Sequence, residues 1–134
     1  MTIIETARMT MNSYVDALIA REEFAKYFAP DVMLRMMGTD QEAHGSDGVE
    51  GLIRYLHERA FDAHPELKSL LVDGERAALE AEFVGKHVGD FMGKAATSKQ
   101  VRVPYSVAYD LEGDRITALR IYMPMDTLLR QLEA

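Results

Sequence analysis

The stretch RAALEAEFVGKHVGDFMGKAATSKQVRVPYSVAYDLEGDRITALRIYM, residues Arg76–Met123, decides the fold because it contains three long segments of alternating character. These segments are Arg76–Gly89, Val101–Leu111 and Arg115–Met123. Alternation with a period of two residues is typical of half-buried β-strands. The apolar positions are Ala77, Leu79, Ala81 and Phe83 in the first segment, Val103, Tyr105, Val107 and Tyr109 in the second, and Leu119, Ile121 and Met123 in the third. We therefore predict three strands with one apolar concave face that other elements must cover.

A Glu-Gly-Asp sequence at residues 112–114 separates the last two strands and predicts a hairpin turn centred on the glycine. With this turn, Val107 lies opposite Leu119, and Tyr105 lies opposite Ile121.

Two amphipathic helices are predicted before this stretch. Thr2 and Glu5 have the spacing of a capping box, and helical spacing of apolar residues follows over residues 3–20. Ser46 or Asp47 can cap a later helix that ends before Pro65. The apolar stripe of this later helix consists of Val49, Leu52, Ile53, Leu56 and Ala60. The other predicted elements are a short helix at Glu22–Phe28, a strand at residues 32–37, a polar loop at Gly38–Ser46, a strand at Leu67–Val72 with a hairpin turn at Asp73-Gly74, and one or two helical turns from Asp126.

Helices followed by antiparallel strands with matching apolar faces predict an α+β fold. We expect a cone-shaped roll in which the N-terminal helices pack on a curved, mainly antiparallel sheet. A chain of 134 residues is long enough for one core without disulfides or metal, so we expect a single domain over residues 1–134.

The composition argues against several classes of partner. The formal net charge is −7, the pI is near 5.0, and Lys and Arg are scattered, which disfavours nucleic acid or anionic membrane as a partner. Cysteine is absent, which excludes disulfides, thiolate catalysis and cysteine-ligated metal. The N-terminal residues lack the apolar core of a secretory signal, and no apolar run has membrane-spanning length. We expect a soluble, cytoplasmic protein without cofactors.

A set of short segments spread over nearly the whole chain carries a family resemblance. The segments are Phe28-Ala-Pro-Asp31, Gly48-Val-Glu-Gly51, Gly85-Lys-His87-Val-Gly89, Phe91-Met-Gly93, Ala96-Thr97, Tyr109-Asp-Leu-Glu-Gly113-Asp-Arg-Ile116 and Leu128-Leu-Arg-Gln-Leu132. Together they resemble the SnoaL-like polyketide cyclases, within the superfamily of ketosteroid isomerase and nuclear transport factor 2. The resemblance implies a cone-shaped α+β barrel of the cystatin-like kind.

The catalytic residues of these cyclases are not carried over. Members of the family use an aspartate on the last strand as general base, and the resemblance places that position at Ile121, with a histidine position at Leu119. Polar positions of the family fall at Tyr105, Val107 and near Leu34. An isoleucine cannot accept a proton, so the resemblance implies the scaffold without its acid–base pair.

The comparison with ketosteroid isomerase gives a similar result. Tyr14 falls where the isomerase has a helical tyrosine close to its site, but the position of the isomerase base falls at Met36. The Arg-x-Asp pair and last-strand Asp of limonene epoxide hydrolase have no counterpart at the matching places.

Two titratable residues elsewhere are candidates for catalysis. Asp126 follows the last strand and is either the N-cap of the final helix or a displaced base. His87 lies in a Gly-x-His-x-Gly segment and is either part of a bend in the sheet or an acid–base residue. His44, His57 and His64 are predicted in a loop, on the polar side of a helix and before a proline, so we expect no metal site.

A small apolar or aromatic ligand is the predicted partner of the interior. Tyr14 and Tyr105 are the inward residues best able to offer a hydroxyl to a ligand oxygen. The predicted ligand-binding residues are Tyr14, Leu34, Met36, Tyr105, Val107, Leu119, Ile121 and Met123. We hypothesise a protein that binds a small hydrophobic molecule in an apolar cavity without converting it. Two alternatives stay open: an isomerase or cyclase acting on a polyketide- or steroid-like substrate by proton transfer, and a non-catalytic structural or dimerisation module.

The outer face of the predicted sheet suggests a homodimer. Its small residues are Ala78, Ser106, Ala108 and Ala118, and its pairing groups of both signs are Glu80, Glu82, Arg102, Asp110 and Arg120, with Tyr122 beside them. A flat centre with charges of both signs suits a self-complementary two-fold interface, and charges on neighbouring strands should form cross-strand ion pairs.

Overall fold

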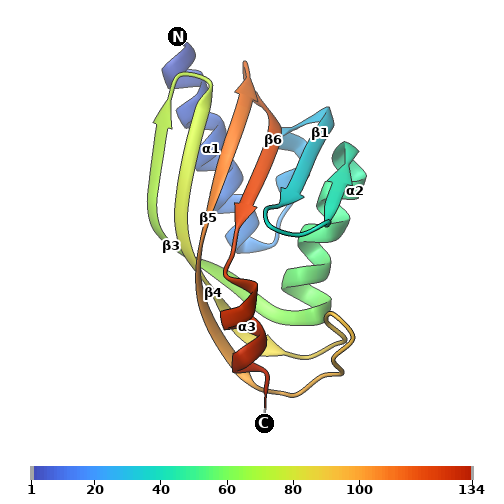
Figure 1. Cartoon of the computed structure of the whole chain (residues 1–134). Coiled ribbons are helices and arrows are strands. Elements are labelled where there is room, and N and C mark those ends of the chain that lie inside the picture. The colour runs from blue at the N-terminus through green and yellow to red at the C-terminus, as the bar shows by residue number, and fades with distance from the viewer. Residues whose placement is uncertain (1, 134) are drawn as a thin grey trace.

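The computed structural model describes residues 2–133 and shows the predicted α+β fold, with three helices packed on a curved, open six-stranded sheet (Figure 1). The elements are α1 (Ile3–Ala20), the 3₁₀-helix η1 (Phe24–Tyr27), β1 (Phe28–Met36), β2 (Glu42–His44), α2 (Gly45–Arg54), the π-helical segment η2 (Tyr55–Ala60), β3 (Phe61–Asp73), β4 (Arg76–His87), β5 (Gln100–Glu112), β6 (Arg115–Tyr122) and α3 (Met125–Gln131). Within residues 2–133, no helix is long and apolar enough to cross a membrane.

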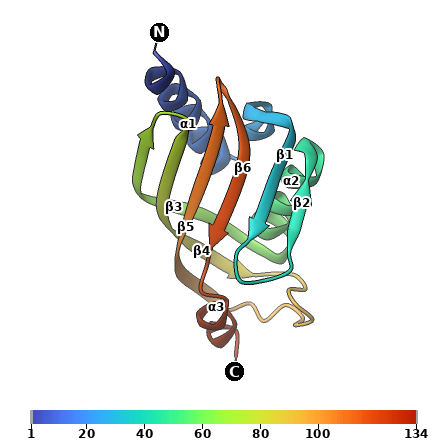
Figure 2. The same ribbon diagram turned by 45° about the horizontal axis from the view of Figure 1, so that its top comes forward.

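The sheet has the order β2-β1-β6-β5-β4-β3, and Figure 2 shows β1 next to β6 with β2 beyond it. Strands β3 to β6 form the predicted antiparallel run. Strand β1 joins β6 in parallel, with Leu34 beside Leu119 and Met36 beside Ile121. The short edge strand β2 lies in the segment predicted as a polar loop, Gly38–Ser46.

The predicted register of the β5–β6 hairpin is wrong by two residues. Val107 pairs with Ile121, and Tyr109 pairs with Leu119. The turn is one residue shorter than predicted, and Thr117 is an extra residue in a β-bulge. A shift of two residues keeps each side chain on its face, so the predicted apolar face is still correct.

Helix α1 begins and ends as a capped helix. The Thr2 hydroxyl accepts a hydrogen bond from the Glu5 backbone N–H at 3.1 Å, as the capping-box spacing predicts. Arg21 ends the helix with a left-handed φ of 58°. Its guanidinium donates to Asp62 Oδ1 at 2.8 Å and to the Ala63 carbonyl at 2.9 Å, which fixes the end of α1 against β3.

The start of α2 differs from the sequence prediction. Neither Ser46 nor Asp47 is the N-cap, because β2 ends at His44 and Gly45, with φ of 79°, turns the chain directly into the helix. No side chain caps α2 among the residues described. The final turns widen into the π-helical segment η2, which ends at Ala60.

Strand β3 begins at Phe61, six residues before the predicted start at Leu67. The predicted strand starts after Pro65 because proline cannot donate a hydrogen bond within a sheet. β3 is an edge strand, where a proline is tolerated.

Two apolar clusters fill the fold. The first contains the rings of Tyr14, Phe24, Phe28 and Tyr109, and the Tyr14 centroid lies 5.6–6.1 Å from the other three. The second surrounds Phe61, whose centroid lies 5.2 Å from that of Phe83 and 5.1 Å from that of Phe91. Tyr105 and Met125 pack against both clusters.

The outer sheet face carries the predicted cross-strand ion pairs. Arg102 donates to Glu82 at 2.6 Å and to Glu66 at 3.1 Å, and Arg120 pairs with Asp110 at 3.0 Å. These groups lie on strands β3 to β6 and leave the inner face apolar.

Candidate functional site

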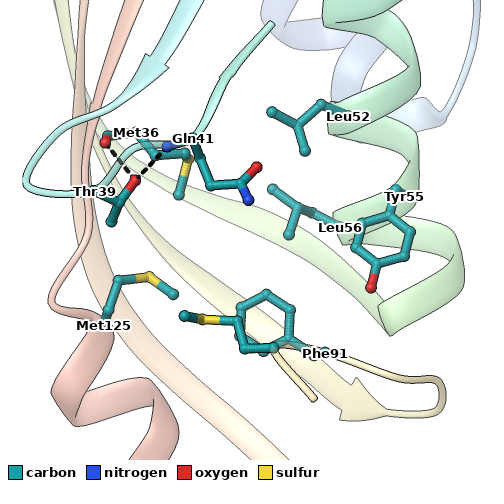
Figure 3. Close-up of a pocket in the computed structure, with 9 residues that line it drawn as sticks. Met36, Thr39, Gln41, Leu52, Tyr55, Leu56, Phe91 and Met125 are labelled. Carbon is teal, nitrogen blue, oxygen red and sulfur yellow. Dashed lines mark hydrogen bonds between the residues drawn. The ribbon is translucent and has the colours of Figure 1, made fainter. Parts of the chain in front are cut away.

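An apolar cavity of about 180 Å³ lies between α2, η2, the β1–β2 loop, the loop after β4 and the start of α3 (Figure 3). It is lined by Met36, Thr39, Gln41, Leu52, Tyr55, Leu56, Phe91, Met92 and Met125. Met36 and Leu52 also pack against the first cluster, and Leu56 and Phe91 belong with the second, so the cavity lies where the two clusters meet.

The β1–β2 loop forms one wall and is held by its own hydrogen bonds. The Thr39 hydroxyl donates to the Met36 carbonyl at 2.8 Å and accepts the Gln41 backbone N–H at 3.0 Å. The Met36 backbone N–H donates to the Gln41 carbonyl at 3.0 Å. The backbone of this wall is therefore fixed on both sides of the turn.

The π-helical turn of η2 forms the opposite wall. Leu52 and Leu56 are four residues apart and both face the cavity (Figure 3). The Tyr55 hydroxyl donates to the Asp90 carbonyl, which ties η2 to the loop after β4. π-Helical turns often occur at functional sites. η2 places two consecutive residues, Tyr55 and Leu56, on the cavity wall.

The loop at residues 88–99 closes the cavity with Phe91 and Met92. Its first residues, Val88 and Gly89, both donate backbone hydrogen bonds to the Ala60 carbonyl, at 2.9 and 3.0 Å. Phe91 and Met92 belong to the Phe-Met-Gly segment of the family resemblance, but nothing in their spacing predicts that they face a cavity.

Of the eight predicted ligand-binding residues, Met36 lies on the cavity wall. Four are buried within the first cluster, namely Tyr14, Leu34, Val107 and Leu119. Three are half-buried at its border or that of the second cluster, namely Tyr105, Ile121 and Met123. Ligand contact by these seven residues stays a prediction.

The interior tyrosines are hydrogen-bond donors rather than bases. Burial raises the pKa of Tyr14, Tyr105 and Tyr109 above the ordinary phenol value. All three phenols therefore stay protonated at neutral pH.

His87 is fully buried and does not line the cavity. Its Nδ1 accepts the Thr97 backbone N–H at 3.1 Å and lies 3.0 Å from the Thr97 hydroxyl. An Nδ1 that accepts an N–H leaves the ring proton of the neutral form on Nε2. The His87 ring packs on Phe61, with 5.1 Å between the centroids. Its hydrogen bonds to Thr97 connect the end of β4 to the far end of the 88–99 loop.

Asp126 is not the predicted N-cap. α3 begins one residue earlier, at Met125, with Pro124 in the N-cap position and no side-chain cap among the residues described. The Asp126 side chain is 79% exposed and lies 3.6 Å from Arg130.

We expect Asp126→Asn and Asp126→Ala each to change the free energy of unfolding by less than about 0.5 kcal/mol, because exposed ion pairs contribute little. Urea denaturation measures this change. A loss above about 1 kcal/mol in the alanine variant alone would restore the capping role.

The sequence predicts His57 on the polar side of its helix, but the structure places its ring against the core. Its ring is half-buried, its Nδ1–H donates to the Ile53 carbonyl at 2.8 Å, and its centroid lies 5.3 Å from that of Phe83. The π-helical turn changes the angular spacing that the sequence reading assumed. Burial lowers the pKa of His57 below the ordinary histidine value.

The lowered pKa predicts acid-sensitive stability. Below about pH 6.5 the unfolded chain takes up a proton at His57 that the folded protein binds less well. The free energy of unfolding therefore decreases as the pH is lowered, until the pH is below the folded-state pKa of His57. We expect a steeper fall between pH 7 and 5 in the wild type than in His57→Gln. His64→Gln, at an exposed histidine, should keep the wild-type slope. Equal slopes in the wild type and His57→Gln would contradict the assignment.

Comparison with known proteins places this geometry in a family. A sequence model described as SnoaL-like polyketide cyclase matches residues 8–132. No functionally curated protein matches the chain. A proposed SnoaL-like polyketide cyclase from Jannaschia sp. CCS1 is 16% identical with a TM-score of 0.87, over 100% of this chain and 96% of that one.

Two further solved structures share the fold. AclR, a proposed hydroxylase from Streptomyces galilaeus, is 22% identical with a TM-score of 0.79, over 96% of each chain. A proposed ketosteroid isomerase from Kribbella flavida DSM 17836 is 22% identical with a TM-score of 0.70, over 92% of this chain and 81% of that one. The match of the family model to residues 8–132 shows that the chain belongs to the SnoaL-like polyketide cyclase family.

Proposed function

We propose that the protein binds a small apolar or aromatic molecule in the cavity and does not transfer protons to or from it. The observation that carries this proposal is the cavity wall. Six of its residues are apolar, namely Met36, Leu52, Leu56, Phe91, Met92 and Met125, and the other three are Thr39, Gln41 and Tyr55. Concave, mostly apolar sites with a few polar groups are typical of small-molecule binding.

The volume limits the size of the ligand. An apolar cavity of about 150 Å³ holds benzene, so about 180 Å³ accommodates one ring with a short substituent. Met36, Met92 and Met125 line the cavity, and flexible thioethers can move to admit a larger molecule. Met92 is 63% exposed, which places the adjustable part of the wall at the mouth.

Within the part of the chain that the structure describes, the cavity wall offers no group suited to general acid–base catalysis. A general base must lie within hydrogen-bond reach of the proton that it removes. Neither His87 nor Asp126 lines the cavity, and Tyr55 uses its hydroxyl proton on Asp90. A bound enolisable ketone should therefore remain unconverted.

Calorimetric titration with toluene tests the proposal. We expect saturable binding to the wild type and at least tenfold weaker binding to Leu52→Trp, which fills the cavity. Leu67→Trp, at an exposed leucine of β3, is the matched control and should bind as the wild type does. Absence of binding by the wild type, or equal binding by Leu52→Trp, would overturn the proposal.

We also propose that two copies associate through the outer face of β3 to β6. Ala78 and Ala108 are neighbours across β4 and β5 and make the centre of this face flat. Leu71 and Tyr122 on the same face are 69% and 47% exposed, and ion pairs of both signs surround them. Exposed apolar residues on a flat face with mixed charges suit a two-fold interface.

Light scattering at micromolar concentration tests the dimer. We expect the mass of two chains for the wild type and of one chain for Ala108→Arg, which adds bulk and charge at the centre of the face. Ala20→Arg, at the exposed end of α1, should remain dimeric. A wild-type mass of one chain would exclude the dimer.

A further inference from the structure

We infer that the ligand is a neutral one-ring compound that carries a carbonyl or hydroxyl oxygen, and that the carboxamide of Gln41 recognises this oxygen. The inference rests on the proposed function and specifies its ligand class. Three polar side chains line the cavity, and two of them already use their protons within the protein. Thr39 donates to the Met36 carbonyl at 2.8 Å, and Tyr55 donates to the Asp90 carbonyl.

Gln41 is the remaining polar side chain. Its backbone N–H and carbonyl are both hydrogen-bonded within the β1–β2 loop, at 3.0 Å each. Gln41 is an exposed residue at the rim of the cavity, and its carboxamide has no hydrogen-bond partner among residues 2–133. The carboxamide points across the cavity toward the α2–η2 wall (Figure 3). A carboxamide both donates and accepts, so it can donate to a ketone oxygen or accept from a hydroxyl.

The charges around Gln41 select against an anion. Among residues 2–133, no lysine, arginine or histidine lines the cavity. Asp40 and Glu42 flank Gln41 in the chain, and the nearby Arg35 is already paired with Glu42, to which it donates at 2.7 and 3.0 Å. The Arg35 hydrogen bonds also lower the pKa of Glu42, so this carboxylate stays ionised at neutral pH. A carboxylate that leaves water without a cationic partner binds poorly.

Three probes with the same number of heavy atoms separate these effects: cumene, which is apolar; acetophenone, which carries a neutral carbonyl; and benzoate, which is anionic. Each is titrated calorimetrically into the wild type at neutral pH. We expect acetophenone to bind about three- to tenfold more tightly than cumene, which is the range for one hydrogen bond partly open to water. We expect benzoate to bind at least tenfold more weakly than acetophenone.

Gln41→Leu should abolish the preference for acetophenone over cumene while leaving the cumene affinity within about twofold. Gln100→Leu, at an exposed glutamine at the start of β5, is the matched control and should keep the preference. Melting curves of both variants check that they fold.

The outcomes distinguish the role of Gln41 from the proposed binding of an apolar molecule in the cavity. If cumene and acetophenone bind equally, or if Gln41→Leu keeps the preference, the role of Gln41 is wrong and the proposed apolar site stands. Benzoate binding as tight as that of acetophenone overturns the requirement for a neutral ligand. If none of the three probes binds, the proposed function fails, and this inference fails with it.

Discussion

Replacing Gly85 by alanine is expected to destabilise the protein by roughly 3 kcal/mol or more, at the upper end of the overpacking range. A Cβ at this position would lie 2.3 Å from the Asp62 carbonyl oxygen and 2.5 Å from the Ala63 Cα. Both are backbone atoms of β3, which cannot move without disturbing the hairpin. The glycines around His87 predict a bulge or sharp bend, and at Gly85 the structure shows instead a close approach of two regularly paired strands.

Gly48→Ala is the matched control, because a Cβ there would meet no atom within 4 Å. Gly48 lies inside α2, so alanine should stabilise the protein by about 0.5–1 kcal/mol. Urea denaturation of both variants measures the difference. Similar stabilities for the two variants would show that the β3–β4 contact is looser than described.

Tyr14→Ala is expected to cost about 3–5 kcal/mol, the range for truncating a buried aromatic side chain. Tyr14 is 1% exposed, and its ring contacts those of Phe24, Phe28 and Tyr109. Tyr14→Phe keeps these ring contacts and removes only the hydroxyl, so it should cost only about 0.5–1.5 kcal/mol. Thermal and urea unfolding measure both losses.

The phenylalanine variant also separates a core role from a ligand role. Tyr14 does not line the cavity, so Tyr14→Phe should bind toluene and acetophenone as the wild type does. A variant that folds normally but loses affinity for acetophenone would show that Tyr14 reaches the ligand, as the sequence reading predicts.

Much of the fold could be predicted from local patterns. The alternation of β4, β5 and β6 and the cap of α1 each depend on neighbouring residues, and the structure has them close to the predicted positions. The parallel pairing of β1 with β6 could not be predicted in this way, since it joins segments more than eighty residues apart. The one-residue bulge at Thr117 and the six-residue π-helical segment η2 are local irregularities that leave no periodic signal.

The candidate site was harder to predict because loops and helix ends form it. The sequence reading centred the ligand on the inner face of β5 and β6, where Val107 and Leu119 lie. In the structure, the first cluster fills that interior, and the cavity opens beside it at Met36. Phe91 reaches the wall only because the 88–99 loop is held against Ala60, a contact that depends on tertiary structure.

Methyl NMR of labelled methionines tests most directly the claim that a small apolar molecule binds in the cavity. The chain has nine methionines, and three of them, Met36, Met92 and Met125, line the cavity. Met11 is buried in the first cluster and Met9 is exposed on α1, so both serve as internal controls. Titration with toluene should shift the methyl signals of Met36, Met92 and Met125 along one saturable curve and leave those of Met9 and Met11 unchanged. Unchanged cavity signals at saturating toluene, or shifts centred on Met11, would contradict the account.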